Sequence, residues 1–576
     1  MSTAGPDPRP SAGALSINRE ATLVFCCAAV FLCFATLRAL DLPAPYYDDV
    51  GFLDLGNQAR ELGGPLGLLR ALFAGRWSDD WRNPLYVALL SLVAGRDPAY
   101  HARALTLTVA LGVLALLSCW WVARRHLGRR PALVLLVFLS LSETLIAYSG
   151  RESAEPLLLI CWAFATGALL DGVRQQKPSR WLLAGVFAGL AQLCKGSGLF
   201  FIFCFALALL LTRGPRALRD PWAWGMGLTF AAAASPLLVR NVRLYGSPLH
   251  HWNNRLLWID RLPDFAEIYA PHALDRLPHG FLDYLHRTTF LRLLWERVVL
   301  GLGETAVHLG DAMSLVSPRP FGPLHLVWVV LGFAAGIWAV RLLWRAPPSF
   351  ERTFFLVQAA FFAAFFVFFS VAGGSSRYLF PMTISLAAVA ARELLARAKA
   401  QGTWRRGLPA LAAAAALIAP LVALAAQLGN PTDRALPPGF EETQVWLEQK
   451  LRTGEAYAVD SRSHLEPEWR LPASNQMVIV SSTWERKPLT PEELLSWLRE
   501  ERVRYAVIDA SSHKDASARY FFFDKLRLTP DGSLPPSGFP EGTRLAWADP
   551  GRHFFILDLQ GESVPAPQPP TARGEE

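Results

Sequence analysis

The stretch Tyr46-Tyr47-Asp48-Asp49-Val50-Gly51-Phe52 follows the first long apolar run of the sequence, residues 21–40. If that run crosses a membrane, two adjacent carboxylates stand where the chain leaves the bilayer. Such a pair is costly, because the two charges repel each other and lose water. Asp48 or Asp49 could simply cap a helix that begins near Val50. The alternative is a chemical role, and one residue can do both.

The composition indicates a membrane protein. Of the 576 residues, 52% are hydrophobic and the mean hydropathy is +0.25, above the roughly 45–50% apolar content of soluble domains. The excess lies in long runs such as 353–371 and 408–426, and runs of about 18 or more apolar residues are typical of membrane spans. The formal net charge is +8, but many basic residues cluster between apolar runs, which argues against nucleic-acid binding.

The seven cysteines all lie in apolar runs without metal-ligand spacing. A disulfide framework is therefore not expected. Residues 1–20 are polar and rich in Pro, Ser and Gly, and we expect a disordered tail. Residues 21–40 lack a convincing cleavage site, so we interpret them as an uncleaved first span.

Eleven spans are predicted, near residues 21–40, 102–122, 132–149, 156–171, 181–195, 197–212, 222–240, 323–343, 353–372, 378–396 and 408–427. The loops that carry most arginines and lysines alternate regularly along the chain. By the positive-inside rule they are cytoplasmic. The N-terminus is then inside, and the acidic pair and the C-terminal segment are outside.

Three outer segments are long: residues 41–100, 241–321 and 429–576. The first contains amphipathic stretches near 52–62 and 65–74, which predict helices lying along the membrane surface. Residues 85–94 are too short to be a span.

The last outer segment predicts a small α/β domain. We expect helices at 440–451 and 491–501, and strands at 456–459, 477–480, 505–508 and 554–557. The predicted organisation is a disordered tail at 1–20, a transmembrane domain at 21–428, an extracytoplasmic α/β domain at 429–561, and a second disordered tail at 562–576.

Several ionisable residues at span ends are candidates for a site, because charge near the bilayer interior is expensive. Those on the predicted outer face are Glu152, Glu155, Lys195, Arg240 and Arg377. Glu155 precedes Pro156, an arrangement that also suits a helix start. Lys195 could snorkel to the interface, and the arginines could anchor to lipid headgroups. The outer face is the minority side for arginine, however, so topology alone does not account for them.

Acids beside cations on one membrane face suit the transfer of a sugar from a lipid phosphate to a hydroxyl. Arg or Lys can hold the leaving phosphate by charge-assisted hydrogen bonds. A carboxylate can act as base for the attacking hydroxyl. Displacement at the anomeric carbon then inverts its configuration. This reaction needs no nucleotide site, and the sequence shows no Gly-rich phosphate loop.

Four segments carry a family resemblance: Asp48-Asp49-Val50-Gly51-Phe52, Asn83-Pro84-Leu85-Tyr86, Ser235-Pro236-Leu237-Leu238-Val239-Arg240-Asn241 with Tyr245-Gly246-Ser247-Pro248, and Arg377-Tyr378-Leu379-Phe380-Pro381. In order and spacing they resemble polytopic glycosyltransferases of the GT-C fold, family 39, which includes protein O-mannosyltransferases and the aminoarabinose transferases of lipid A. A fifth match, residues 189–196, is weaker. The resemblance covers residues 21 to about 400 and leaves out the C-terminal domain.

The resemblance implies roles for individual residues. Asp48 would be the base, Asp49 would support it or orient the acceptor, and Glu155 would be a second carboxylate. Glu152 is a close competitor of Glu155. The residues that would bind substrate are Lys195, Arg377, Tyr378, Arg240 and Arg82. Relatives that bind a metal have a Glu-Lys-Pro-Pro segment where this chain has Trp81-Arg82-Asn83-Pro84. The possible metal-binding glutamate is therefore missing, and no metal site is predicted. Asp79, Asp80, His250 and His251 could substitute for the missing ligand.

The resulting hypothesis is an inverting glycosyltransferase of a bacterial inner membrane. Its partners would be a polyprenyl-phosphate sugar, an acceptor that is a lipid, glycan or protein, and membrane lipids, with no nucleic acid. Two alternatives remain: a non-enzymatic carrier or flippase of lipid-linked sugars, and a scaffold whose α/β domain docks other envelope proteins. The carrier would need polar residues through the depth of the spans, whose middles are almost purely apolar.

Overall fold

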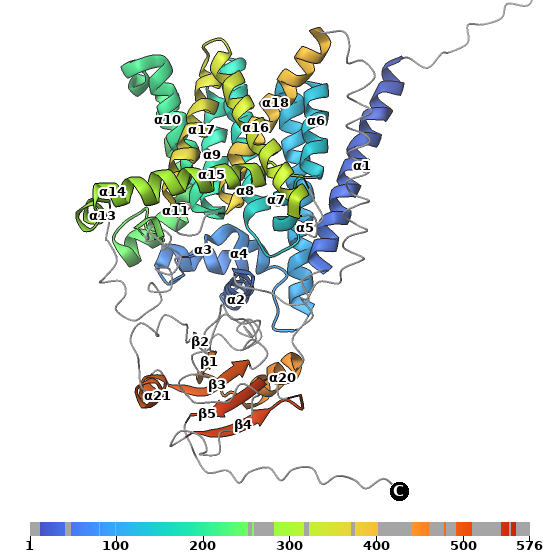
Figure 1. The fold of residues 1–576 in the computed structure, drawn as a ribbon. Coiled ribbons are helices and arrows are strands. Elements are labelled where there is room, and N and C mark those ends of the chain that lie inside the picture. The colour runs from blue at the N-terminus through green and yellow to red at the C-terminus, as the bar shows by residue number, and fades with distance from the viewer. Residues whose placement is uncertain are drawn as a thin grey trace, which may run out of the picture. The chain divides into compact units, whose positions relative to one another are not determined.

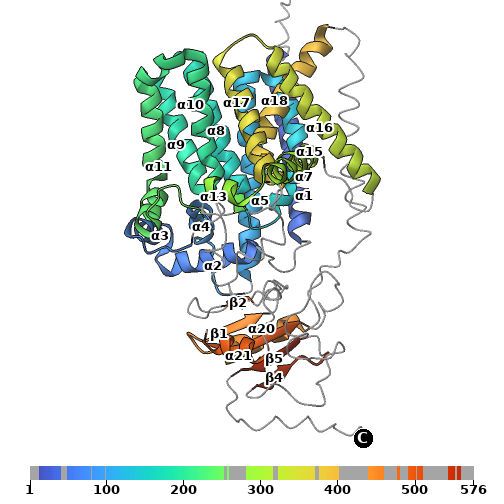
Figure 2. The same ribbon diagram turned by 60° about the vertical axis from the view of Figure 1, so that its left-hand side comes forward.

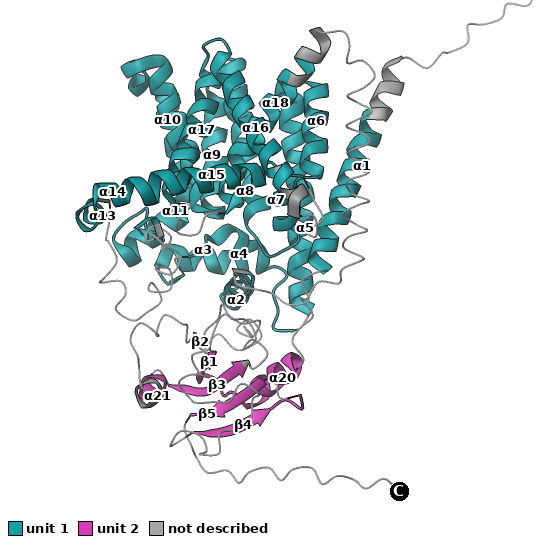
Figure 3. Cartoon of the chain, in the orientation of Figure 1, with its two compact units in different colours: residues 1–435 teal, residues 436–576 magenta. Residues whose placement is uncertain are grey.

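The computed structural model describes residues 12–40, 48–79, 81–97, 99–251, 256–258, 281–315, 322–369, 375–400, 439–459, 477–479, 491–500, 502–509, 543–551 and 554–559. The chain divides into two compact units, 1–435 and 436–576 (Figure 3). The first is helical and the second contains the β-sheet.

Up to Tyr245, the described residues of the first unit form eleven α-helices: α1 (Ala12–Leu40), α2 (Asp48–Glu61), α3 (Gly64–Ala74), α4 (Pro84–Leu90), α5 (Ala99–Leu127), α6 (Arg129–Ser140), α7 (Glu143–Ser149), α8 (Glu155–Arg174), α9 (Ser179–Cys194), α10 (Leu199–Arg213) and α11 (Pro221–Tyr245). Short 3₁₀ turns flank α10: η1 (Gly196–Gly198) and η2 (Gly214–Arg219). Further along are α13 (Phe281–Arg287), α14 (Phe290–Leu293), the π-helical turn η6 (Leu294–Leu300), α15 (Gly301–Ala312), α16 (Gly322–Arg345), α17 (Phe350–Phe369), η8 (Ser376–Leu379) and α18 (Phe380–Ala400), with a 3₁₀ turn η4 (Leu256–Trp258) before them.

The long helices of this unit pack side by side, and both views show α2, α3 and α4 gathered at one end of them (Figures 1 and 2). Six helical segments within the described residues are long and apolar enough to cross a membrane, namely residues 20–40, 99–127, 155–174, 196–219, 221–245 and 350–369. The polytopic helical fold is therefore confirmed. The count of eleven spans stays a prediction, and the eleventh, 408–427, lies outside the described residues.

The predicted span 132–149 is not one helix. It is broken between α6 and α7, where Glu143 N donates to Ser314 O at 3.3 Å and Ser142 caps α7 through Leu145 N at 3.4 Å. A Ser side chain that competes for backbone donors favours a new helix start over continuation. Because of the break, α7 is short and ends at the turn that leads into α8.

The helices α2, α3 and α4 form a small apolar layer of their own. Leu55 and Ala59 of α2 pack with Leu68 and Leu72 of α3, and Val87 of α4 closes the cluster. These are the stretches predicted as amphipathic, and one face of each is buried as the pattern requires. The layer fixes the position of the first turn of α2, where Asp49 lies.

The close approach of α9 and α11 depends on glycine. A Cβ added at Gly185 would lie 2.3 Å from Met226 O, and one at Gly189 would lie 2.7 Å from Phe230 O. Two small residues four apart let helix backbones touch, as in membrane helix pairs generally. The register also shows that α9 and α11 run in the same direction. Both therefore bring their C-terminal ends to the same end of the bundle.

The second unit is a small α/β domain. Its strands are β1 (Ala456–Val459), β2 (Met477–Ile479), β3 (Val503–Asp509), β4 (Arg544–Ala548) and β5 (Phe554–Asp558), in the order β2-β1-β3-β5-β4. β1 is parallel to β2 and β3, and β5 is antiparallel to β3 and β4. The helices are α20 (Phe440–Lys450) and α21 (Pro491–Glu500).

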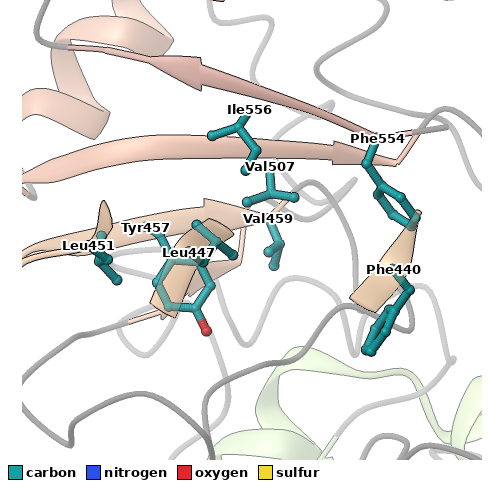
Figure 4. Close-up of a cluster of buried hydrophobic side chains, with 8 residues drawn as sticks. All are labelled: Phe440, Leu447, Leu451, Tyr457, Val459, Val507, Phe554 and Ile556. Carbon is teal, nitrogen blue, oxygen red and sulfur yellow. The ribbon is translucent and has the colours of Figure 1, made fainter. Parts of the chain in front are cut away.

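The core of this domain lies between α20 and one face of the sheet. Figure 4 shows its eight buried side chains: Phe440, Leu447, Leu451, Tyr457, Val459, Val507, Phe554 and Ile556. The strand residues alternate along each strand, as expected for side chains on one face of a sheet. Four of the five strands match the sequence-based expectation. The exception, β4, is an edge strand of the described sheet whose residues are all half-buried, whereas β1 and β5 are buried at every position.

Candidate functional site

The site is built around the turn that joins α7 to α8. Glu155 is the first residue of α8, with Pro156 following it in the first turn, and its side chain is buried with 4% exposure. Ser153 Oγ donates a hydrogen bond to Glu155 Oε2 at 2.6 Å, and Glu155 N donates to Ser153 Oγ at 3.3 Å. The turn therefore holds the carboxylate in a defined orientation at the end of the helix.

Two cations from distant parts of the chain meet this carboxylate. Lys195, which caps the C-terminus of α9, donates to Glu155 Oε1, and Arg377 Nε lies 3.6 Å from the same oxygen. Lys195 Nζ also lies 4.5 Å from the centre of the Tyr378 ring, and the Arg377 guanidinium lies 5.2 Å from it. Four of the residues singled out in the sequence, Glu155, Lys195, Arg377 and Tyr378, are thus brought together.

Asp49 lies in a second ion pair. Its side chain is 1% exposed, and its Oδ1 accepts hydrogen bonds from Arg151 Nε at 2.9 Å and from Nη2 at 2.8 Å. Burial alone would lower the pKa of the Arg151 guanidinium, but the charge and hydrogen bonds of the Asp49 carboxylate raise it by more. The pKa of Arg151 is therefore raised overall, and the guanidinium stays charged. The charge of Arg377 acts in the opposite sense on that pKa. The two arginines are therefore electrostatic neighbours.

Ring and hydroxyl contacts join the turn to the segment of Arg377. Tyr148 in the last turn of α7 shares a hydrogen bond with Ser375 Oγ at 3.0 Å, and the Arg377 guanidinium lies 5.6 Å from the Tyr148 ring. The Asp49–Arg151 pair and the Glu155 cluster consequently belong to one charged group, called the ion cluster below: Asp49, Arg151, Glu155, Lys195 and Arg377.

Arg151 is a site residue that the sequence reasoning missed. It stands in the same outer turn as Glu152 and Glu155. The argument that singled out Arg240 and Arg377, arginine on the minority face, applies equally to Arg151 and could have found it. Tyr148 and Ser153 carried no such signal, because a hydroxyl beside a membrane is unremarkable until its partner is known.

Glu152 lies behind the turn and contacts a different partner from Glu155. Its Oε1 lies 2.6 Å from His101 Nδ1 on α5, and its side chain is buried. The next residue, Ser153, donates from its backbone N to Tyr86 Oη at 3.2 Å, and that hydroxyl pairs with Thr108 at 2.5 Å. This polar network anchors the turn to α4 and α5, which favours a positioning role for Glu152.

Arg82 packs on the first turns of α2. Its guanidinium lies 5.3 Å from the centre of the Phe52 ring and 4.0 Å from Asp79 Oδ2. A Cβ at Gly51 would lie 2.3 Å from the Arg82 guanidinium carbon. Glycine in the motif Asp48-Asp49-Val50-Gly51 thus makes room for Arg82 beside the acidic end of the helix.

Arg240 is buried near the end of α11 and organises the neighbouring loop. It donates to Asp79 O and, at 2.8 Å, to Asn241 Oδ1, and its guanidinium lies 5.7 Å from the Tyr245 ring. Tyr245 Oη in turn donates to Ser78 O at 2.6 Å. Through these contacts Arg240 positions the loop that carries Arg82.

The remaining predicted residues are placed as follows. α2 begins at Asp48, whose side chain lies outside the described part of the structure, as does Asp80. His250 stacks on Tyr245 with ring centres 3.9 Å apart. Within the residues that the structure describes, no group of three His, Cys, Asp or Glu side chains could hold a metal ion.

The ion cluster has the chemistry of an anion site. Its three cations face two carboxylates, which leaves one positive charge in excess. A phosphate can bind there by charge-assisted hydrogen bonds from the guanidinium and ammonium groups. The carboxylates keep the cations in place while the site is empty of such an anion.

Comparison with known proteins identifies a matching family model. Residues 88–239, from α4 to α11, match the model of the dolichyl-phosphate-mannose-protein mannosyltransferase family. No curated protein matches the sequence.

Solved structures of membrane glycosyltransferases are similar over most of the chain. ArnT from Cupriavidus metallidurans, solved bound to undecaprenyl phosphate, has 15% identity and a TM-score of 0.52, covering 95% of this chain and 98% of its own. The oligosaccharyltransferase of Archaeoglobus fulgidus, in complex with Zn and sulfate, has 15% identity and a TM-score of 0.53, covering 85% and 68%. The archaeal oligosaccharyltransferase AglB from the same organism, in complex with an inhibitory peptide and a dolichol-phosphate, has 14% identity and a TM-score of 0.50, covering 86% and 69%. The chain has the GT-C fold of these enzymes.

Proposed function

We propose that the protein is an inverting glycosyltransferase that moves a sugar from a polyprenyl-phosphate donor to an acceptor hydroxyl. The observation that carries the proposal is the ion cluster, in which Lys195, Arg377 and Arg151 meet at the end of the bundle where α2 begins. Two of the structural neighbours were solved with a lipid phosphate bound, and the family match covers Glu155 and Lys195.

Lys195 and Arg377 hold the donor phosphate in this proposal. Both already bind the Glu155 carboxylate, so a phosphate competes with another oxyanion for them. As the sugar leaves, negative charge grows on the phosphate, and preplaced cations stabilise that charge best. The bond between the anomeric carbon and the phosphate oxygen breaks, and the lipid phosphate departs as the leaving group.

Asp48 acts as the base and Asp49 positions it. Asp49 is fixed by Arg151, so the first turn of α2 is tied to the turn that carries Glu155. Asp48 takes the proton of the acceptor hydroxyl as its oxygen attacks the anomeric carbon. The carboxylate and the phosphate then work on opposite sides of the reacting carbon, which inverts its configuration.

The reaction takes place on the non-cytoplasmic side of a bacterial inner membrane in this proposal. The bundle end opposite the ion cluster carries the arginine-rich connections of α5 to α6, α8 to α9 and α10 to α11. Such connections face the cytoplasm by the positive-inside rule. The acceptor is a hydroxyl of an envelope lipid, glycan or protein.

The test is transfer by the purified protein. The full chain is incubated with synthetic polyprenyl-phosphate sugars and extracted envelope acceptors, and sugar movement is followed by mass spectrometry. Asp48→Asn should lower transfer by about 10²–10⁴-fold, the range for loss of a general base, while donor binding persists. Asp54→Asn, an acid farther along the same helix, serves as the matched control with normal transfer.

Two outcomes would change the assignment. Near-normal transfer by Asp48→Asn removes that residue from the mechanism. Tight binding of lipid-linked sugar without transfer to any acceptor, together with sugar-lipid movement between leaflets, identifies a carrier instead.

A further inference from the structure

A cavity of about 330 Å³ lies in the bundle between α5, α6, α8, α17, α18 and the end of α16. On α8 the cavity is lined by Leu159, Trp162, Thr166 and Leu170. One end of the cavity is at Arg174, the last residue of α8. Residues spaced by three, four and seven positions share one face of a helix. From 159 to 174 that face extends roughly 22 Å at about 1.5 Å per residue.

The walls of the cavity are almost wholly apolar. On α18 they include Pro381, Ile384, Ala388 and Val389, and on α17 Phe355. A volume of about 330 Å³ is at the lower end of the ~300–1,000 Å³ of ligand pockets. Long, narrow and apolar, the space suits one hydrocarbon chain and does not suit a sugar or a peptide, whose polar groups would find no partners there.

The end of the cavity at the basic face is charged. Arg174, Arg352 and Arg392 line it, with Glu351 as the opposing acid. Arg174 forms an ion pair with Glu351, in which Arg174 Nη2 lies 2.7 Å from Glu351 Oε2. Arg392 forms an ion pair with Glu393, in which Arg392 Nη2 lies 3.2 Å from Glu393 Oε1. Three arginines against the two carboxylates that pair with them, Glu351 and Glu393, leave this rim with one positive charge in excess, which complements an anionic headgroup.

Two buried ring nitrogens on the lining lack a hydrogen-bond partner. Within the described part of the chain, His126 Nε2 and Trp162 Nε1 make no hydrogen bond. Asp171 Oδ1 lies 3.6 Å from the His126 nitrogen, beyond hydrogen-bond reach. A buried polar atom without a hydrogen-bond partner destabilises the fold. An oxygen of a bound molecule at the rim can accept from His126 and remove that cost.

We propose that this cavity binds an anionic phospholipid, with one acyl chain between α8 and α18 and the phosphate at the rim of Arg392, Arg352 and Arg174. Basic pockets between membrane helices on the cytoplasmic side are sites for anionic headgroups. The basic rim is distinct from the ion cluster, which lies at the other end of the same helices. A zwitterionic lipid lacks the net charge that the rim complements.

The bound lipid also stiffens the helices that carry the ion cluster. Leu159 lies one turn from Glu155 on α8, and Pro381 lies one turn from Arg377. An acyl chain that fills the space between these walls sets the separation of α8 and α18, and with it the distance between Glu155 and Arg377.

The experiment measures lipid binding, so its result does not depend on glycosyl transfer. The purified full chain is stripped of lipid in detergent, and native mass spectrometry then follows binding of phosphatidylglycerol and of phosphatidylcholine with the same acyl chains. Phosphatidylglycerol should bind in preference. Arg392→Gln should weaken it about five-fold, the effect of losing one basic residue near the headgroup. Arg345→Gln, which removes an exposed arginine of the same face that does not line the cavity, should leave it unchanged.

Filling the cavity provides the second arm. Ala388→Phe should abolish preferential binding, whereas Leu211→Phe on the exposed face of α10 should not. Phosphatidylglycerol with a photoreactive acyl chain should label peptides of α8 and α18 in the wild type and lose that labelling in Ala388→Phe. Equal binding of the two lipids, or full labelling of α8 and α18 in Ala388→Phe, would overturn the proposal.

Discussion

Glu155 is the residue on which the arrangement of the ion cluster depends. Replacing it by Gln leaves Lys195 largely buried without its carboxylate, and breaking such a buried pair costs about 3–5 kcal/mol. We expect Glu155→Gln to lower the melting temperature and to abolish transfer. The double variant Glu155→Gln/Lys195→Met removes one of the two cations that lose the carboxylate, so it should regain part of the thermal stability and still not transfer sugar. Recovery of transfer in the double variant would show that the two residues serve stability alone.

Asp54 predicts a pH dependence of stability. Burial raises its pKa from 3.8 to about 6, against the hydrogen bond from Gln58 Nε2 at 2.7 Å, which lowers it. A carboxyl with a raised folded-state pKa destabilises the fold where it is ionised, above about pH 6, and this penalty disappears as the pH falls toward the unfolded-state value. The melting temperature of the wild type should therefore rise relative to that of Asp54→Asn as the pH is lowered from about 7.5 to about 5. Parallel melting curves for the two proteins across that range would show that Asp54 is solvated.

Individual residues of the ion cluster show which features of the site could be predicted from the sequence. The clustering of charge on one face was enough to predict that Glu155, Lys195 and Arg377 lie together, since such residues are rare near spans. The partners of those residues were not predictable. Glu152 and Glu155 look equivalent in sequence, and only the fold reveals that one contacts His101 and the other Lys195.

At the scale of elements, the contact of α9 with α11 decides where Lys195 stands. Gly185→Ala would place a methyl group 2.3 Å from Met226 O. Backbone cannot yield as a side-chain end can, so we expect a loss of about 1–3 kcal/mol in stability, as for overpacked cores. Gly227→Ala on α11 meets nothing within 4 Å and should gain up to about 1 kcal/mol from helix propensity. Thermal unfolding of the purified variants measures both signs, and equal effects would mean that the helices do not approach so closely.

Elements with a strong period were predictable and interruptions were not. The amphipathic stretches of α2 and α3 and the helices of the second unit match their patterns, because burial of one face dictates the spacing. The break between α6 and α7 has no such signature. It depends on Ser142 and on contacts with Ser314, far along the chain. Local sequence cannot report a contact of that kind.

At the scale of the whole molecule, the direction of the helices fixes which loops share a face. α8 begins at the ion cluster and α9 returns to it, because Glu155 and Lys195 meet there. The loop between them, which contains Gln176, is therefore at the opposite end from Ser247, which follows α11. Whether the second unit lies on the face of Ser247 depends on the predicted span 408–427, which is outside the described residues.

Cysteine labelling in cells tests this topology. In a variant whose seven cysteines are replaced by serine, single cysteines are placed at Gln176, Ser247 and Ser496, and a membrane-impermeant thiol reagent is added to intact cells. The odd number of predicted spans puts Ser247 and Ser496 outside and Gln176 inside. We expect the first two to be labelled before lysis and Gln176 only after it. If Ser496 behaves like Gln176 while Ser247 is labelled, residues 408–427 do not cross the membrane, and the α/β domain lies on the face opposite the ion cluster. If Ser247 is protected and Gln176 is labelled, the orientation is reversed and a donor displayed in the outer leaflet cannot reach Lys195 and Arg377.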